Sequence, residues 1–428
     1  MMGLPTELLV LILTCFFGNY LDHMDEFIDA RSKAMMVCRR WCSLISSVGA
    51  FWSSYILFPN KKLSDFTSWT SRFPLIIREL RVYLDPAHTF AFRDNELVER
   101  LDIRRTTYKA VLYSTGCQRL FFSVAEGRTL RLLMRLLRIA HGDHLQSLSI
   151  TRVYPIRVPS GGRFKRLLSP IFHRRLPSLF YLRLRAFVLS WTDLVYSAVA
   201  RVLVFHDIMD LSMRPTWNQL GRVVMASPHL TRLSLRHFAC DALLGWLPSI
   251  CLPTLEELDM CFCSANTVLF LLSCDLPSLS TLSATFGSPD DMDSLLLCCN
   301  MFPNLRAFCP SGRCDRIDDI LSMFRQMPVL VHLNLADASS SFMDALVMAS
   351  SDGMYACPAL RLLFVSDCTI RDIHYLIACR LLVTARLDTI KAHNVDMSGG
   401  VNDWIHAHVG ELINATECEF DDDWIFHI

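Results

Sequence analysis

The sequence lacks the short motifs that identify most classes of enzyme. Its 428 residues contain no Gly-x-Gly-x-x-Gly, no Gly-x-x-x-x-Gly-Lys-(Ser/Thr), no Gly-x-Ser-x-Gly and no His-Glu-x-x-His, and only 16 residues are glycine. Those patterns position phosphate groups, nucleophiles and metal ions. The histidine pair His141 and His144 has no cysteine at zinc spacing. We therefore expect a protein that is not an enzyme and binds no cofactor and no metal, with catalysis by a Cys–His pair as a weaker alternative.

Secretion and membrane signals are also missing. The 17 cysteines are odd in number and include no Cys-x-x-Cys, a pattern that indicates reduced thiols inside the cell, in the cytoplasm or the nucleus. The apolar run Leu8–Phe17 has neither the basic region nor the small-residue cleavage site of a signal peptide. No stretch reaches the roughly 18 uninterrupted apolar residues of a membrane span. We expect no membrane partner.

Net charge is absent overall but not locally. Lys+Arg and Asp+Glu both number 42, and 52% of the residues are hydrophobic, which excludes a mainly disordered chain. Residues 61–201 hold 25 basic and 10 acidic residues, whereas residues 251–428 hold 9 basic and 24 acidic ones. This asymmetry indicates either two faces with different partners or two solvated surfaces without a role. The basic segment lacks a compact run with interleaved aromatics, so we expect no nucleic acid partner.

A repeat occupies most of the chain. The pattern Leu-x-x-Leu-x-Leu, with other apolar residues allowed, begins at Ile77, Leu145, Leu179, Val199, Leu230, Leu255, Leu279, Leu305, Leu330, Leu360 and Leu382. From Leu230 to Leu330 successive copies begin 24 to 26 residues apart, which is the period of leucine-rich repeats. A proline precedes the first Leu by two residues in seven copies: Pro177, Pro228, Pro253, Pro277, Pro303, Pro328 and Pro358.

The repeat predicts an α/β fold. Each copy forms a short strand with its Leu positions inward, and helices such as 315–327 and 341–350 return the chain. Stacked copies bury their apolar faces in a solenoid, a curved parallel sheet with helices on the convex side. We expect this solenoid over residues 59–428, with irregular first units in 85–176, a loop at 154–176 and an acidic C-terminal cap at 396–428.

Residues 1–58 have a different, helical pattern. Leu4-Pro5-Thr-Glu-Leu8 opens a helix in which Leu4, Leu8 and Ile12 share a stripe. A second amphipathic helix is expected over residues 34–46, and Ala50-Phe51-Trp52 closes the segment. Such a short bundle either packs on the solenoid or keeps an apolar stripe for a partner.

These residues resemble an F-box. The set Leu-Pro-Thr-Glu-Leu-Leu, Val-Cys-Arg-Arg-Trp at 37–41, and Phe-Trp at 51–52 is similar to the F-box that precedes leucine-rich repeats in fungal proteins. The stretch 14–33 departs from the family by being longer and more acidic than the usual connection. The resemblance implies docking on the adaptor subunit of an SCF-type cullin–RING ubiquitin ligase, and through it on cullin. The adaptor-facing residues it implies are Leu4, Pro5, Leu8, Ile12, Val37, Cys38, Trp41 and Trp52, each of which also fits internal packing.

Strand residues between the Leu positions face away from the core and predict a surface for an unknown protein target. They are Arg183, Arg185, Arg232, Ser234, Arg236, Glu257, Asp259, Thr281, Ser283, His332 and Asn334. The order runs from basic to acidic to polar, which suits a partner with complementary charges or merely keeps the sheet soluble. The chain is thus expected to be a ligase subunit that recognises a target, and the alternative is a repeat scaffold that never meets the adaptor.

Overall fold

The structure is a computed structural model that divides into two compact units, Met1–Ile156 and Arg157–Ile428. The helical segment lies in the first unit together with the first strands, while a boundary near residue 58 stays a prediction. The residues described are 5–18, 24–47, 54–57, 78–84, 107, 117–125, 129–130, 132–133, 144–153, 178–186, 191, 200–209, 213–241, 250–286, 302–312, 316–335, 338, 340–351, 357–366, 368–382, 386–395 and 401–414. The loop predicted at 154–176 lies outside them.

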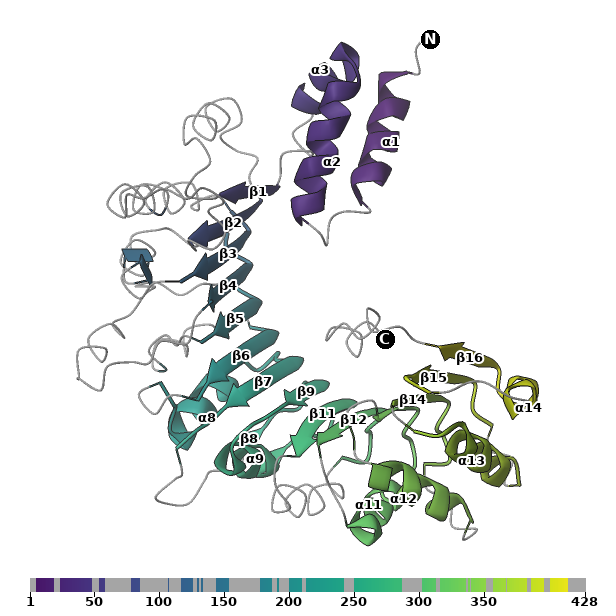
Figure 1. Ribbon diagram of the computed structural model, residues 1–428. Coiled ribbons are helices and arrows are strands. Elements are labelled where there is room, and N and C mark those ends of the chain that lie inside the picture. The colour runs from purple at the N-terminus through teal and green to yellow at the C-terminus, as the bar shows by residue number, and fades with distance from the viewer. Residues whose placement is uncertain are drawn as a thin grey trace, which may run out of the picture. The chain divides into compact units, whose positions relative to one another are not determined.

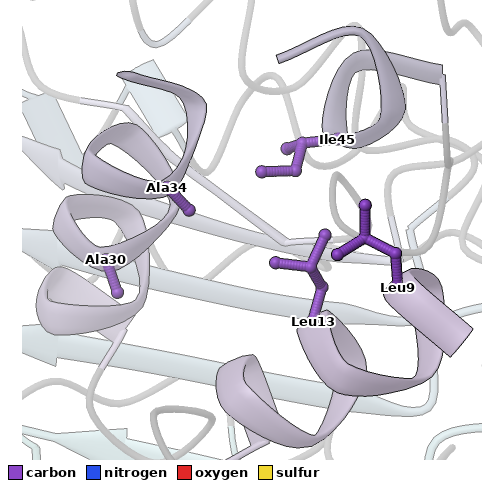
Figure 2. Close-up of a cluster of buried hydrophobic side chains, with 5 residues drawn as sticks. All are labelled: Leu9, Leu13, Ala30, Ala34 and Ile45. Atoms are coloured by element: carbon purple, nitrogen blue, oxygen red, sulfur yellow. The ribbon is translucent and has the colours of Figure 1, made fainter. Parts of the chain in front are cut away.

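Three helices open the first unit: α1 (Thr6–Gly18), α2 (Met24–Val37) and α3 (Arg39–Ser47). Their buried side chains meet in one cluster, the helical core, shown in Figure 2: Leu9, Leu13, Ala30, Ala34 and Ile45. The single helix predicted over 34–46 is wrong in extent, because the helix is interrupted at Cys38, between α2 and α3. The amide of Cys42 donates to the carbonyl of Cys38 (3.0 Å), so Cys38 begins a new helix.

Four parallel strands follow in the first unit: β1 (Ser54–Leu57), β2 (Glu79–Leu84), β3 (Arg119–Val124) and β4 (Ser147–Arg152). Their order along the sheet is the chain order. Leu80, Leu120 and Leu148 lie in register across β2, β3 and β4 and are almost fully buried. The region 85–176, where irregular first units are expected, therefore contains β3 and β4 among its described residues. Tyr83 of β2 packs against the helical core.

The second unit has the same arrangement within itself, with ten parallel strands among its described residues (Figure 1). They are β5 (Tyr181–Arg185), β6 (Val202–Ile208), β7 (Arg232–Phe238), β9 (Glu257–Met260), β11 (Thr281–Phe286), β12 (Ala307–Gly312), β13 (His332–Leu335), β14 (Leu362–Ser366), β15 (Thr389–His393) and β16 (Glu411–Asn414). A second, small sheet pairs β8 (Ile250–Cys251) with β10 (Cys274–Asp275).

Helices line one side of this sheet, and neighbouring helices α11 to α14 contact one another (Figure 1). They are α8 (Trp217–Met225), α9 (Ala265–Leu272), α11 (Ile317–Arg325), α12 (Ser340–Ser351), α13 (Ile370–Leu382) and α14 (Val401–His408). The predicted helices at 315–327 and 341–350 are thus present. The strand leucines are buried, and burying each one stabilises the fold by roughly 1.5–3 kcal/mol. The fold is a leucine-rich-repeat solenoid, as the sequence predicts.

The recurring proline occupies one position of a turn that precedes each strand. In six copies the amide two residues after the proline donates to the carbonyl of the residue before it, as from Leu230 to Ser227 (3.0 Å) and from Leu305 to Phe302 (3.2 Å). Proline therefore stands second in a four-residue turn, where its fixed φ is already correct. The next side chain often bonds the preceding repeat, as Ser278 does to the carbonyl of Pro253 (2.6 Å).

Two of the weak repeat copies were placed incorrectly. In β6, Leu203 and Phe205 align with the buried Leu233 and Leu235 of β7, whereas the predicted copy gives these positions to Val202 and Val204. The frame is therefore wrong by one residue and the faces exchange. The copy predicted from Leu382 fails because Leu382 ends α13. The strand instead follows Leu387.

Residues 401–414 differ from the irregular cap expected over 396–428. They form α14 and β16, and β16 pairs with β15 in parallel. This is one more repeat unit, because its strand continues the sheet in the same direction. Residues 415–428 lie outside the described residues, so a capping role for them stays a prediction.

Candidate interaction surfaces

An apolar stripe is exposed on the N-terminal helices. Leu9 and Leu13 of helix α1 point into the helical core (Figure 2). Because successive residues of a helix are rotated by 100°, other positions of α1 face outward. Six large apolar side chains here are 41–77% exposed and are together called the apolar ridge: Leu8, Leu11, Ile12, Phe16, Met36 and Val37. Exposed apolar residues gathered on one module are typical of a surface that a partner covers.

The adaptor-facing residues implied by the F-box resemblance fall into three groups. Leu8, Ile12 and Val37 belong to the apolar ridge, and Pro5 and Cys38 are exposed beside it. Trp41 is partly buried against the helical core, so it contributes to internal packing. Leu4 and Trp52 lie outside the described residues. Leu11, Phe16 and Met36 were missed, although Leu11 and Phe16 follow from the same helical spacing.

A second surface lies on the strand face opposite the buried leucines in the second unit. Four arginines project from two strands, Arg183 and Arg185 from β5 and Arg232 and Arg236 from β7; they are called the arginine cluster. Strand β6 lies between them in register. Because the frame of β6 is shifted by one residue from the predicted one, Val202, Val204 and His206 lie on this face, where the sequence did not predict them.

Carboxylates accompany three of the four arginines. Arg236 Nε donates to Asp259 Oδ2 (2.6 Å), and Arg185 Nε donates to Asp207 Oδ2 (2.7 Å). Arg232 Nε lies 3.5 Å from Glu257 Oε2, directly across the β7–β9 pair. Burial raises the pKa of Glu257, and Arg232 opposes that shift.

Asp259 organises the centre of this surface without being exposed. It is 1% exposed, and its carboxylate accepts from the hydroxyl of Ser234 (2.8 Å) and from the thiol of Cys261 (3.1 Å) as well as from Arg236. Such a buried carboxylate offers a partner almost no surface. Its part in target binding, if any, is to hold Arg236 in place.

His206 completes a chain of hydrogen bonds but not a catalytic triad. Its Nε2 lies 2.9 Å from Ser234 Oγ. Because Ser234 gives its proton to Asp259, the imidazole must donate to the serine oxygen, the reverse of what an activated serine needs. Burial, and then the repulsion of the surrounding arginines, lowers the pKa of His206 to about 3, so the ring is neutral at physiological pH.

The remaining predicted target-binding residues lie farther along the sheet. His332 and Asn334 are on β13, separated from β9 by β11 and β12, so they do not join the arginine cluster. Both are half-buried, and burial lowers the pKa of His332. Thr281 is half-buried on β11, whereas Ser283 is 3% exposed.

Several cysteine thiols among the described residues are shifted away from the thiolate form. All thirteen described cysteines are free thiols. Burial raises the pKa of Cys117, Cys274 and Cys357 to about 12 and, together with Asp259, that of Cys261 to about 11. A raised pKa suppresses the thiolate that nucleophilic catalysis requires.

Over the same part of the chain, no group of three or more His, Cys, Asp or Glu side chains is placed to hold a metal ion. Nor is any described helix both long enough and apolar enough to cross a membrane.

Comparisons with known proteins do not assign the chain to a family. No protein-family model matches it, and no curated protein matches it in sequence. A chain in the crystal structure of the TLR13–ssRNA13 complex is 14% identical with a TM-score of 0.42; the similarity covers 77% of this chain and 40% of that one. A chain in the crystal structure of the yeast Rad7–Elc1 complex is 12% identical with a TM-score of 0.35, over 86% of this chain and 94% of that one. The protein thus spans less than half of the first chain it resembles.

Proposed function

We propose that the protein is the substrate-recognition subunit of an SCF-type cullin–RING ubiquitin ligase. Its N-terminal helices dock on the adaptor, which links it to cullin, and its repeats capture a protein target. It performs no chemistry itself; it raises the concentration of target lysines near the catalytic subunits. The free thiols of the described residues support an intracellular location.

The observation that carries this proposal is the exposure of the apolar ridge. The opposite face of α1 is buried in the helical core, so packing of the three helices among themselves does not account for Leu8 and Ile12. Aliphatic side chains at positions i and i+4 of one helix are typical anchors for a partner groove. The resemblance of residues 4–12 and 37–41 to an F-box implies that this partner is the SCF adaptor subunit.

Adaptor binding by the full chain tests the proposal. We expect Leu8→Asp and Ile12→Asp each to weaken binding of the purified adaptor at least tenfold, since each loses apolar burial and buries a charge. Ser43→Asp is the matched control, because it adds the same charge at an exposed position of α3, which carries none of the ridge residues, and it should bind normally. Circular dichroism verifies that all three variants keep their helices. Absence of binding by the unmodified chain, or equal binding by the ridge variants, would refute the proposal.

A repeat scaffold without a ligase is the second candidate. Tyr83 of β2 packs on the helical core, so part of the helical surface is covered within the chain itself. On this reading the helices close the first repeat and meet no adaptor. A chain that retains its target partner but never binds the adaptor would favour the scaffold.

A further inference from the structure

The arginine cluster carries a positive charge that its own carboxylates do not balance. Arg185, Arg232 and Arg236 each have a carboxylate neighbour, as described above. Arg183 has none among the described residues, and its Nε atom is buried without a hydrogen-bond partner. A buried guanidinium nitrogen left unbonded costs free energy that a bound acceptor would recover. Among the described residues, the surface therefore lacks a carboxylate partner for Arg183.

An exposed aromatic pair lies at the C-terminal ends of the neighbouring strands. His237 and Phe262 stack with their ring centroids 4.6 Å apart and their planes at 5°, and Phe262 is 55% exposed. Both residues have left-handed backbones, with φ of 47° and 55°, and so do Ala186 and Asp207 at the equivalent positions of the two preceding strands, so this conformation is a feature of the repeat. Exposed aromatic rings beside arginines are typical of binding hot spots.

The sheet register fixes the spacing between these two features. Arg183 aligns with Val204, then with Ser234 and, three strands along, with Asp259, which lies three residues before Phe262. Three strand spacings of about 4.8 Å and three residues of about 3.3 Å place the backbones of Arg183 and Phe262 about 17 Å apart. An extended peptide covers that distance in about five residues.

We infer that this surface binds an extended acidic segment of a protein partner, in which one Asp or Glu meets Arg183 and an aromatic or large aliphatic residue about five positions away meets Phe262. The inference rests on the proposed function, because it describes the target that the ligase subunit would capture. One unpaired guanidinium calls for one carboxylate. A phosphorylated side chain carries up to two charges and is favoured by several free arginines.

Peptide selection on the purified full chain tests the spacing. A random library of 12-residue peptides displayed on phage is selected on the full chain and depleted on an Arg183→Glu variant. We expect the surviving peptides to be enriched in Asp or Glu about five residues from Phe, Trp or Leu. Enrichment of peptides without an acidic residue, or of peptides with no fixed spacing, would overturn the inference.

Fluorescence polarisation with one selected peptide, labelled with fluorescein, tests the residues. We expect Arg183→Glu to weaken binding at least tenfold, and Phe262→Ser several-fold. Arg222→Glu is the matched control, since Arg222 is exposed on helix α8 away from this face. Replacing the peptide's acidic residue by arginine should restore binding to the Arg183→Glu variant, which a misfolded protein would not do.

Two further outcomes are decisive. Tighter binding of the same peptide with phosphoserine in place of its acidic residue would overturn the choice of a carboxylate. Leu8→Asp should leave peptide binding unchanged while abolishing adaptor binding. A chain that binds the peptide but no adaptor would refute the ligase and keep the acidic-segment surface, whereas the opposite result would refute only the surface.

Discussion

Removing the buried carboxylate of Asp259 should destabilise the second unit far more than removing an exposed one. Asp259 accepts hydrogen bonds from Ser234, Arg236 and Cys261 across β7 and β9. The Asp259→Ala change leaves the guanidinium of Arg236 and a buried hydroxyl without their acceptor. Both partners then lose a charged hydrogen bond that neither can fully replace with water.

The size of this effect follows from burial. Deleting one member of a buried ion pair costs about 3–5 kcal/mol, and a hydrogen bond to a charged group contributes about 1.5–3 kcal/mol. The Arg236 side chain is 19% exposed and keeps some contact with water. We therefore expect Asp259→Ala to lower the free energy of unfolding by about 3 kcal/mol.

Urea denaturation monitored by tryptophan fluorescence measures this change, because Trp191 packs on Phe205 of β6 and Phe238 of β7. The matched control is Glu256→Ala, which removes an exposed carboxylate from the same repeat and should change stability by less than about 0.5 kcal/mol.

A double variant separates pairing from packing. Asp259→Leu combined with Arg236→Met removes both charges and should cost less than Asp259→Ala alone, since no buried charge is left unpaired. If Asp259→Ala behaves like Glu256→Ala, the carboxylate does not organise this surface. A double variant as unstable as the single one would attribute the loss to packing instead.

Two further predictions concern pH and backbone contact. The folded pKa of His206, about 3, lies below its unfolded value of about 6.5. The unfolded state therefore gains a proton first, and stability falls as the pH drops below 6.5. His206→Gln should remove about 2 kcal/mol of the stability lost between pH 7.5 and pH 5, measured by urea denaturation at each pH; equal losses in both proteins would contradict this. A Cβ at Gly410 would lie 2.5 Å from the carbonyl oxygen of Asp388, so Gly410→Ala should cost about 1–3 kcal/mol. A Cβ at Gly221 would lie 3.0 Å from the terminal methyl of the Ile250 side chain, which can shift, so Gly221→Ala should cost less. Thermal unfolding of both variants measures the difference; a reversed order would refute the reasoning.

The repeat was predictable because each copy carries its own signal. The turn proline, the alternating strand and the period recur within some 25 residues, so local sequence determines local structure. The prediction failed where that signal is degenerate. In the run Val202–Phe205 every residue is apolar, so periodicity alone cannot distinguish the two faces, and only stacking against β5 and β7 fixes the register.

The chemistry of the predicted surface could not be derived in the same way. The sequence predicted that Arg236 and Asp259 lie on one face, but their ion pair joins residues 23 positions apart. Pairing depends on side-chain reach across neighbouring strands, which no linear pattern specifies. The sequence therefore suggested an acidic stretch of surface where the structure has a buried acceptor. Phe262 was missed because its exposure follows from a left-handed backbone rather than from strand alternation.

The N-terminal helices depend on the strands that follow them. Two of the five residues in the helical core are alanines, which bury little apolar area, and a bundle of this size is marginal alone. Tyr83 adds an aromatic ring from β2 and compensates for part of that deficit. Residues 1–58 are thus unsuited to isolation as an adaptor-binding fragment, and the compact unit that presents the apolar ridge extends to Ile156. Anchoring the helices on a sheet also limits the conformational entropy lost on docking, which favours binding through an exposed ridge.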